Sequence, residues 1–224
     1  MIAKRREGAL QSLGEEIANT ITHGIGLILS FVAFYILVCN SLRKSSILCV
    51  ISCSIYGGSL VTLYFTSTLY HACTHISMKK IMRKLDHISI YFLITGTYMP
   101  ITLVALKGSL GWALFGLECG LFLVGILFKI FFGAKYGIVS VLFYLLMGSV
   151  LIFAIKPLFL ALSFQGLLWV LLGGVFYILG IFFYATDQKF SYFHAIWHLF
   201  VLAGSICHFL VVLLYIIPLN AKSF

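Results

Sequence analysis

The sequence predicts an all-α integral membrane protein, folded as a bundle of seven transmembrane helices. Of its 224 residues, 62% are hydrophobic and only 9% are charged, whereas soluble domains average about 25% charged residues. Seven apolar runs also reach the length of about 20 residues that a helix needs to cross a bilayer. No polar region between these runs is long enough to fold as a separate soluble domain.

The seven predicted spans follow one another through short connections. They are approximately Ile17–Val38, Ile47–Ala72, Leu85–Leu106, Leu110–Phe132, Tyr136–Ile155, Leu162–Ala185 and His194–Ile217. Short connections favour antiparallel packing of consecutive helices. The predicted organisation is therefore a cytoplasmic N-terminal segment (1–16), the seven-helix domain (17–217) and a C-terminal tail (218–224).

Several residues distinguish one predicted span from another. Pro100 is expected to kink the third span, and Gly173 with Gly174 should allow close packing of the sixth. Glu118 lies well inside the fourth span, where a protonated or hydrogen-bonded acid is expected and a role in ion passage is the alternative. The six cysteines form no CxxC pair, and most lie within apolar runs, so they are interpreted as small buried hydrophobic residues.

The basic residues predict the orientation of the bundle. The formal net charge is +9, but Lys and Arg are scattered through short connections, so no nucleic-acid partner is expected. With the N-terminus inside, ten of the 15 Lys and Arg residues fall in cytoplasmic segments. This bias predicts that the N-terminus lies in the cytoplasm and the C-terminus outside the cell. The expected location of the protein is the cell membrane. Lys129 is expected to extend its ammonium group toward the interface, and Asp187 and Lys189 are expected to be solvated.

Polar side chains gather at the cytoplasmic ends of the predicted spans. Ser67 and His71 end the second span, Asp86 opens the third, and His194 and His198 open the seventh. Residues four apart lie on one face of a helix, so two imidazoles of the last pair can reach one metal ion. With His71 as a third ligand, an open coordination position would remain, as in catalytic zinc sites.

Simpler interpretations of these histidines remain open. Each one alone can be an interfacial residue bonded to lipid headgroups or loop carbonyls, and imidazole also binds copper, iron and nickel. His75 is four residues from His71 and could compete as a ligand, but a solvated position in the basic loop is favoured. His23 is expected to support the site or pack against it, and His208 to be packed and neutral within its helix.

Asp86 and Ser67 are the predicted catalytic residues. Asp86 does not need to bind the metal directly, because a carboxylate beside it can accept the proton of an activated water. Ser67 could orient a ligand or help to polarise a substrate carbonyl.

Four motifs resemble those of the progestin-and-adipoQ-receptor family. They are Glu16-Ile-Ala-Asn19-Thr-Ile-Thr22-His23, Ser67-Thr-Leu-Tyr-His71, Leu85-Asp86 and His194-Ala-Ile-Trp-His198. Three stretches are similar to its bacterial haemolysin III branch in particular, namely Thr66–Ala72, Asp86–Tyr91 and Gly96–Pro100. The resemblance implies a seven-helix fold with a cytoplasmic-side Zn²⁺ held by His71, His194 and His198, with Asp86 and Ser67 beside it. The adiponectin receptors and alkaline ceramidases of the wider group imply hydrolysis of a lipid amide.

Two hypotheses of function follow from the sequence. The first is a zinc-dependent membrane hydrolase that acts on a lipid amide or ester. The second is a non-enzymatic membrane protein, either a pore-forming cytolysin or a lipid sensor with a structural zinc. The expected partners are membrane lipids and a lipid-like substrate, and the oligomeric state is left open.

Overall fold

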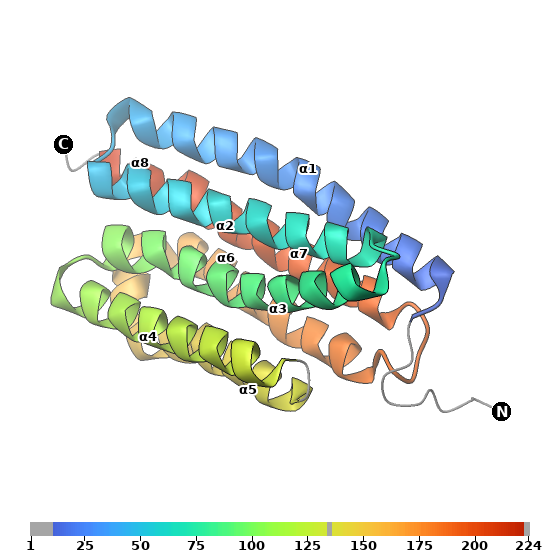
Figure 1. The fold of residues 1–224 in the computed structure, drawn as a ribbon. Coiled ribbons are helices and arrows are strands. Elements are labelled where there is room, and N and C mark those ends of the chain that lie inside the picture. Colours follow the sequence, from blue (N-terminus) through green and yellow to red (C-terminus); the bar gives the residue numbers. More distant parts are fainter. Residues whose placement is uncertain (1–10, 134–135, 222–224) are drawn as a thin grey trace.

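The computed structural model describes residues 11–133 and 136–221, and every regular element within these ranges is a helix (Figure 1). The helices are α1 (Leu13–Lys44), α2 (Ile47–Ala72), α3 (Ile76–Met99), α4 (Gly108–Phe132), α5 (Gly137–Ser149), α6 (Ile155–Thr186), α7 (Phe193–Val211) and α8 (Ile217–Ala221). Three irregular helical segments join some of them: a π-helix η1 (Pro100–Leu106), a 3-10 helix η2 (Val150–Ala154) and a π-helix η3 (Val212–Ile216).

Polar caps set the start of the first three helices. The backbone N–H of Glu15 donates to Oγ of Ser12, and the Glu15 carboxylate accepts from the backbone N–H of Ser12, which forms a capping box for α1. Ser46 caps α2, and His75, exposed at the surface, accepts the N–H of Met78 at the start of α3.

The third helix therefore begins earlier than the sequence predicts. Leu85 was the expected first residue of this span, but α3 starts at Ile76, so Asp86 lies about three turns inside the helix instead of at its opening. The first turns of α3 carry Lys79, Lys80, Arg83 and Lys84. These charges lower the hydropathy of the segment, so a search for apolar runs does not include it in the span. The irregularity expected at Pro100 takes the form of η1, which continues α3 as a π-helix.

The described residues contain six helical segments that are long and apolar enough to cross a membrane, where the sequence predicts seven. The difference arises between Gly137 and Thr186, because the fifth and sixth predicted spans are joined without a polar loop into one segment of 50 residues. Ser163 alone interrupts the helical backbone within α6, with φ 64° and ψ 172°.

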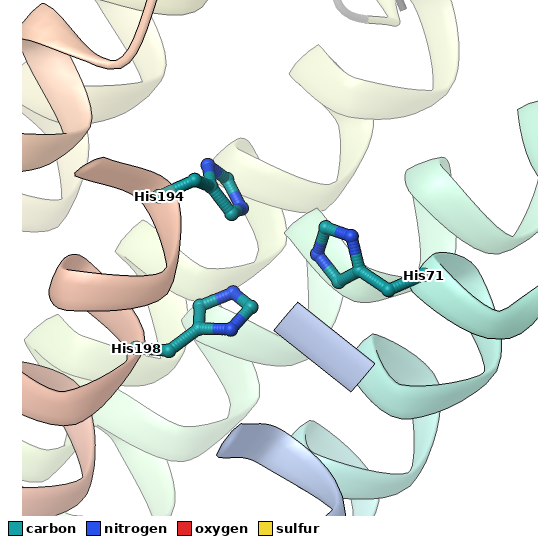
Figure 2. Close-up of side chains that lie close together, drawn as sticks. All are labelled: His71, His194 and His198. Atoms are coloured by element: carbon teal, nitrogen blue, oxygen red, sulfur yellow. The ribbon is translucent and has the colours of Figure 1, made fainter. Parts of the chain in front are cut away.

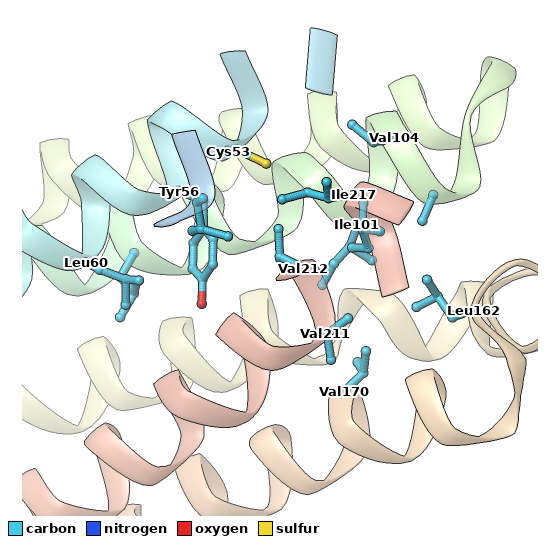
Figure 3. Close-up of a cluster of buried hydrophobic side chains, with 14 of the residues drawn as sticks. Cys53, Tyr56, Leu60, Ile101, Val104, Leu162, Val170, Val211, Val212 and Ile217 are labelled. Carbon is cyan, nitrogen blue, oxygen red and sulfur yellow. The ribbon is translucent and has the colours of Figure 1, made fainter. Parts of the chain in front are cut away.

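The bundle is arranged around α3. Together with η1 it is the most buried segment, with 78% of its most apolar stretch inside the protein, against 22% for α1 and for α4. Figure 1 shows α3 between α2 and α4, with α7 behind α2. The main apolar core joins α2, η1, α6 and the end of α7, through residues such as Leu60, Ile101 and Val211 (Figure 3). Gly173 of α6 allows close packing here, because a Cβ at this position would lie 2.4 Å from Nε2 of His208.

Candidate metal centre

Three histidine side chains meet at the end of the bundle where α1 begins. His71 lies in the last turn of α2, and His194 and His198 lie one turn apart at the start of α7. The three rings point toward one another (Figure 2), and one potential ligand atom from each lies within 4.8 Å of the other two. His71 and His198 are buried, with 4% and 0% of their surface exposed.

The Nδ1 atom of each imidazole already has a partner. Nδ1 of His71 is 2.8 Å from Oε2 of Glu16, and Nδ1 of His194 is 2.8 Å from Oδ2 of Asp187. An ionised carboxylate only accepts hydrogen bonds, so both of these nitrogens carry the proton and donate it.

Thr22 of α1 fixes the third ring in the same way. Its hydroxyl donates to the backbone carbonyls of Ala18 and Asn19, at 2.9 and 3.0 Å. Its oxygen is therefore left to accept, and it lies 3.1 Å from Nδ1 of His198. Nδ1 of His198 thus also carries the proton, which leaves Nε2 of all three rings as a lone pair.

These three Nε2 atoms are buried and have no hydrogen-bond partner among the described residues. Lone pairs that converge without a donor repel one another, and a cation at their centre removes this repulsion. Neutral imidazoles whose second nitrogen is bound to a carboxylate or another oxygen acceptor are the usual ligands of zinc. The residues present therefore fit a metal ion with three protein ligands.

The two predicted catalytic residues lie beside the histidines. Ser67 is one turn before His71 on α2 and is 1% exposed. Asp86 of α3 is 4% exposed, and its carboxyl group faces Ser67 and interacts electrostatically with His194. Three helices thus bring the five predicted site residues to one end of the bundle.

The partners of the histidines were not all foreseen. Asp187 was expected to be solvated, but its side chain is only 10% exposed because it accepts the bond from His194. Glu16 shares its second oxygen with Lys79, at 2.9 Å, so a buried imidazole, a carboxylate and an ammonium form one chain. The spacing of Glu16, Asn19 and His23 along one face of α1 was the available signal, whereas nothing in the loop sequence singles out Asp187.

His23 forms part of the wall of this site. Its ring stacks on that of His198, with centroids 3.5 Å apart and an interplanar angle of 17°. Both of its ring nitrogens are buried without a hydrogen-bond partner among the described residues. Its place beside a possible ligand agrees with a supporting or packing position.

The expectation that Lys129 reaches the interface was wrong. The side chain is 1% exposed, because it turns toward α3, where its Nζ lies 3.0 Å from Nδ1 of His87. An ammonium group can only donate, so Nδ1 of His87 accepts. Tyr144 of α5 donates to the backbone carbonyl of the same histidine at 3.0 Å, which links α3, α4 and α5 near the site.

Comparisons with known proteins agree with the motifs. The model of the family described as "Haemolysin-III related" matches residues 11–209. The chain is 44% identical to "Hemolysin-3" of Bacillus cereus over 93% of its length and 94% of that protein. It is 44% identical to "Hemolysin-3 homolog" of Bacillus subtilis over 95% of its length and 99% of that protein. It is also 29% identical to the human "Monocyte to macrophage differentiation factor", over 72% of this chain and 69% of that protein.

Proposed function

The chain belongs to the haemolysin-III related family of multi-pass cell-membrane proteins, and we propose that it is a zinc-dependent hydrolase of a lipid amide or ester. One observation carries the proposal. Three imidazoles direct their buried, unpartnered Nε2 atoms at one another while their Nδ1 atoms are held by Glu16, Thr22 and Asp187.

The side chains around the histidines supply what a hydrolase needs. A zinc held by His71, His194 and His198 would supply Lewis acidity and would lower the pKa of water to about 7. Asp86 accepts the proton of the attacking water, since its carboxyl group faces the histidines from a third helix. Ser67 donates a hydrogen bond to the oxygen on which negative charge develops. Glu16 and Asp187 hold two of the imidazoles in place by accepting from Nδ1.

The position of the site favours a lipid as substrate. His71 ends α2 and His194 opens α7, so the site lies near the depth where the amide and ester bonds of lipids are found. Large apolar side chains nearby, including Leu69 and Leu85, are exposed on the surface of the bundle. Acyl chains can therefore remain in the bilayer while the linkage reaches the histidines.

We also propose that the bundle crosses the membrane seven times. The start of α1 and the end of α8 lie at opposite ends of the bundle (Figure 1), which requires an odd number of passes. The segment Gly137–Thr186 supplies two of them if the chain reverses at Ser163, and residues 137–162 and 164–186 are each long enough for one span. The bias of basic residues supports a site at the cytoplasmic side.

Metal content tests the site. Purified wild-type protein should carry about one zinc per chain, measured by mass spectrometry of the metal. His71→Ala and the double variant His194→Ala/His198→Ala should lose most of it. His75→Ala is the matched control, because this exposed histidine lies four residues from His71 and caps α3. Full zinc retention in the double variant contradicts the site.

Hydrolysis tests the chemistry. Zinc-loaded wild-type protein should slowly hydrolyse a member of a panel of ceramides, acyl amides and phospholipids. Asp86→Asn should lose turnover by a factor of about 100 or more and keep its zinc, since the proposed role of Asp86 is proton transfer. Equal inactivity of wild type and variant on the whole panel, with zinc bound, would refute the hydrolase.

Membrane permeabilisation is the second candidate function, because the Bacillus cereus relative is named "Hemolysin-3". In this case zinc would be structural, tying α2 to α7. Release of a dye from lipid vesicles by both wild type and Asp86→Asn, without lipid hydrolysis, would favour it.

A further inference from the structure

Glu118 is a buried acid away from the histidines. It lies near the middle of α4, which runs from Gly108 to Phe132, and none of its surface is exposed. Both carboxyl oxygens are buried without a hydrogen-bond partner among the described residues. Leu114, one turn earlier on α4, belongs to a small apolar cluster with Tyr98 of α3 and with Val150 and Ala154 of η2.

One backbone hydrogen bond is missing where α5 meets η2, in the segment that packs against this part of α4. The hydroxyl of Tyr98 donates to the carbonyl of Met147 at 2.7 Å and accepts from the N–H of Leu151 at 3.1 Å. In a regular α-helix, Leu151 would bond to Met147 directly. The inserted hydroxyl replaces that bond at the point where α5 gives way to the 3-10 segment η2. A polar group that interacts electrostatically with Glu118 therefore lies in an otherwise apolar contact.

No counter-charge accompanies the carboxyl group. Across residues 11–133 and 136–221, the titratable groups that interact with Glu118 are Tyr98 on the facing helix and Cys119 next to it in the chain. Neither is a cation. An ionised carboxylate in the middle of a bilayer is costly without a paired charge, so the neutral acid is the form that this environment favours.

We propose that Glu118 is a proton-binding site at mid-depth in the membrane. It lies on α4, whereas the three histidines lie on α2 and α7. The ligand is a proton, and the neutral carboxyl group holds it between α4, Tyr98 and η2. The proposal is independent of metal binding and of hydrolysis, since His71, His194 and His198 lie on α2 and α7.

A hydrophobic carbodiimide tests the proposal on the intact protein in lipid vesicles. A protonated carboxyl group adds its O–H across one C=N bond of dicyclohexylcarbodiimide, and the acyl group then moves to nitrogen, so the product gains the mass of one whole carbodiimide. Peptide mass spectrometry should find this mass on Glu118 after reaction at neutral pH. Labelling should fall as the buffer is made alkaline, because the carboxylate does not react in this way.

Two controls complete the experiment. Glu118→Gln, which has nearly the same shape and no acidic proton, should remove the labelled peptide and keep the zinc content of wild type. A water-soluble carbodiimide should leave Glu118 of wild type unlabelled, because such a reagent does not enter the membrane, where the proposal places the acid. Absence of label on Glu118 at neutral pH overturns the proposal, and so does protection by sodium chloride at constant pH, because a metal cation would then be the ligand. The pH series on wild type distinguishes these outcomes even if the variant does not fold.

Discussion

At the residue scale, the hydrogen bond made by Nδ1 of each imidazole determines whether Nε2 of the same ring can bind a metal. Glu16, Thr22 and Asp187 each hold an Nδ1 proton, and the corresponding Nε2 is then available as a lone pair. These acceptors come from α1 and from the loop before α7, although the histidines themselves lie on α2 and α7. Any loss of an acceptor frees its ring to rotate or to change tautomer.

Removal of one acceptor should weaken metal binding without removing a ligand. Asp187→Ala is expected to lower zinc affinity by about 10- to 100-fold, measured by competition with a chelator. Lys189→Ala is the matched control, because this exposed residue of the same loop does not contact the histidines through its side chain in the described structure. Equal affinities of the two variants would mean that Asp187 does not orient His194.

Spacing predicted the histidines but not their acceptors. His194 and His198 are one turn apart on one helix, so the sequence places their rings on a common face. Asp187 reaches His194 only because the chain turns between α6 and α7, and Tyr192 in that turn adopts φ 64°. Lys129 was misjudged for a similar reason, since its acceptor His87 lies on a different helix and no local pattern reports such a contact.

At the element scale, Ser163 holds a backbone conformation that suits glycine. Its φ of 64° and ψ of 172° are rarely adopted by residues with a side chain. Ser163→Gly should therefore raise the free energy of unfolding by about 1–3 kcal/mol, measured by denaturant titration in detergent. Ser163→Ala should leave it nearly unchanged, because alanine keeps the strain and the hydroxyl contact to Gln165 that it loses is long, at 3.5 Å, and exposed.

The same position tests the number of spans. In a variant without native cysteines, Ser163→Cys should react with a membrane-impermeant maleimide added outside intact cells. This outcome is expected if 137–162 and 164–186 are separate passes, because position 163 then lies at the outer surface. A cysteine that is protected from both sides would place position 163 within the membrane and contradict a reversal of the chain at this residue.

Hydropathy predicted most helices and failed at two kinds of boundary. The basic first turns of α3 are helical but too polar to be counted, so the span was begun at Leu85 instead of Ile76. Between α5 and α6 the opposite occurs, because the chain continues through η2 into α6 without a loop, although Lys156 and Pro157 follow Ile155. Backbone breaks such as that at Ser163 depend on tertiary packing, which composition does not encode.

At the scale of the whole molecule, labelling with the same membrane-impermeant maleimide tests the orientation of the bundle in the membrane. Lys80→Cys, near the start of α3, should be protected from the impermeant reagent in intact cells and should react after permeabilisation. A reversed pattern would place the histidines on the outer face.

Metal binding should also stabilise the bundle, because the ligands belong to α2 and α7 and their acceptors to α1 and the loop before α7. Free zinc at 100 times its dissociation constant adds about 2.7 kcal/mol to the free energy of unfolding. Thermal unfolding of wild type should therefore begin at a lower temperature after treatment with a chelator. His71→Ala should show no such shift, and an equal shift in both proteins would mean that the chelator acts elsewhere.

The distribution of the three imidazoles along the chain has a consequence for biogenesis. Ribosomes release α1 and α2 early, whereas Phe193 and the residues that follow it emerge last. A nascent chain that stops before this point carries one of the three histidines and none of the pair that lies one turn apart. Under the proposed function, metal uptake therefore requires that the last helix has been inserted, so a metal-loaded protein would be one whose translation and insertion are finished.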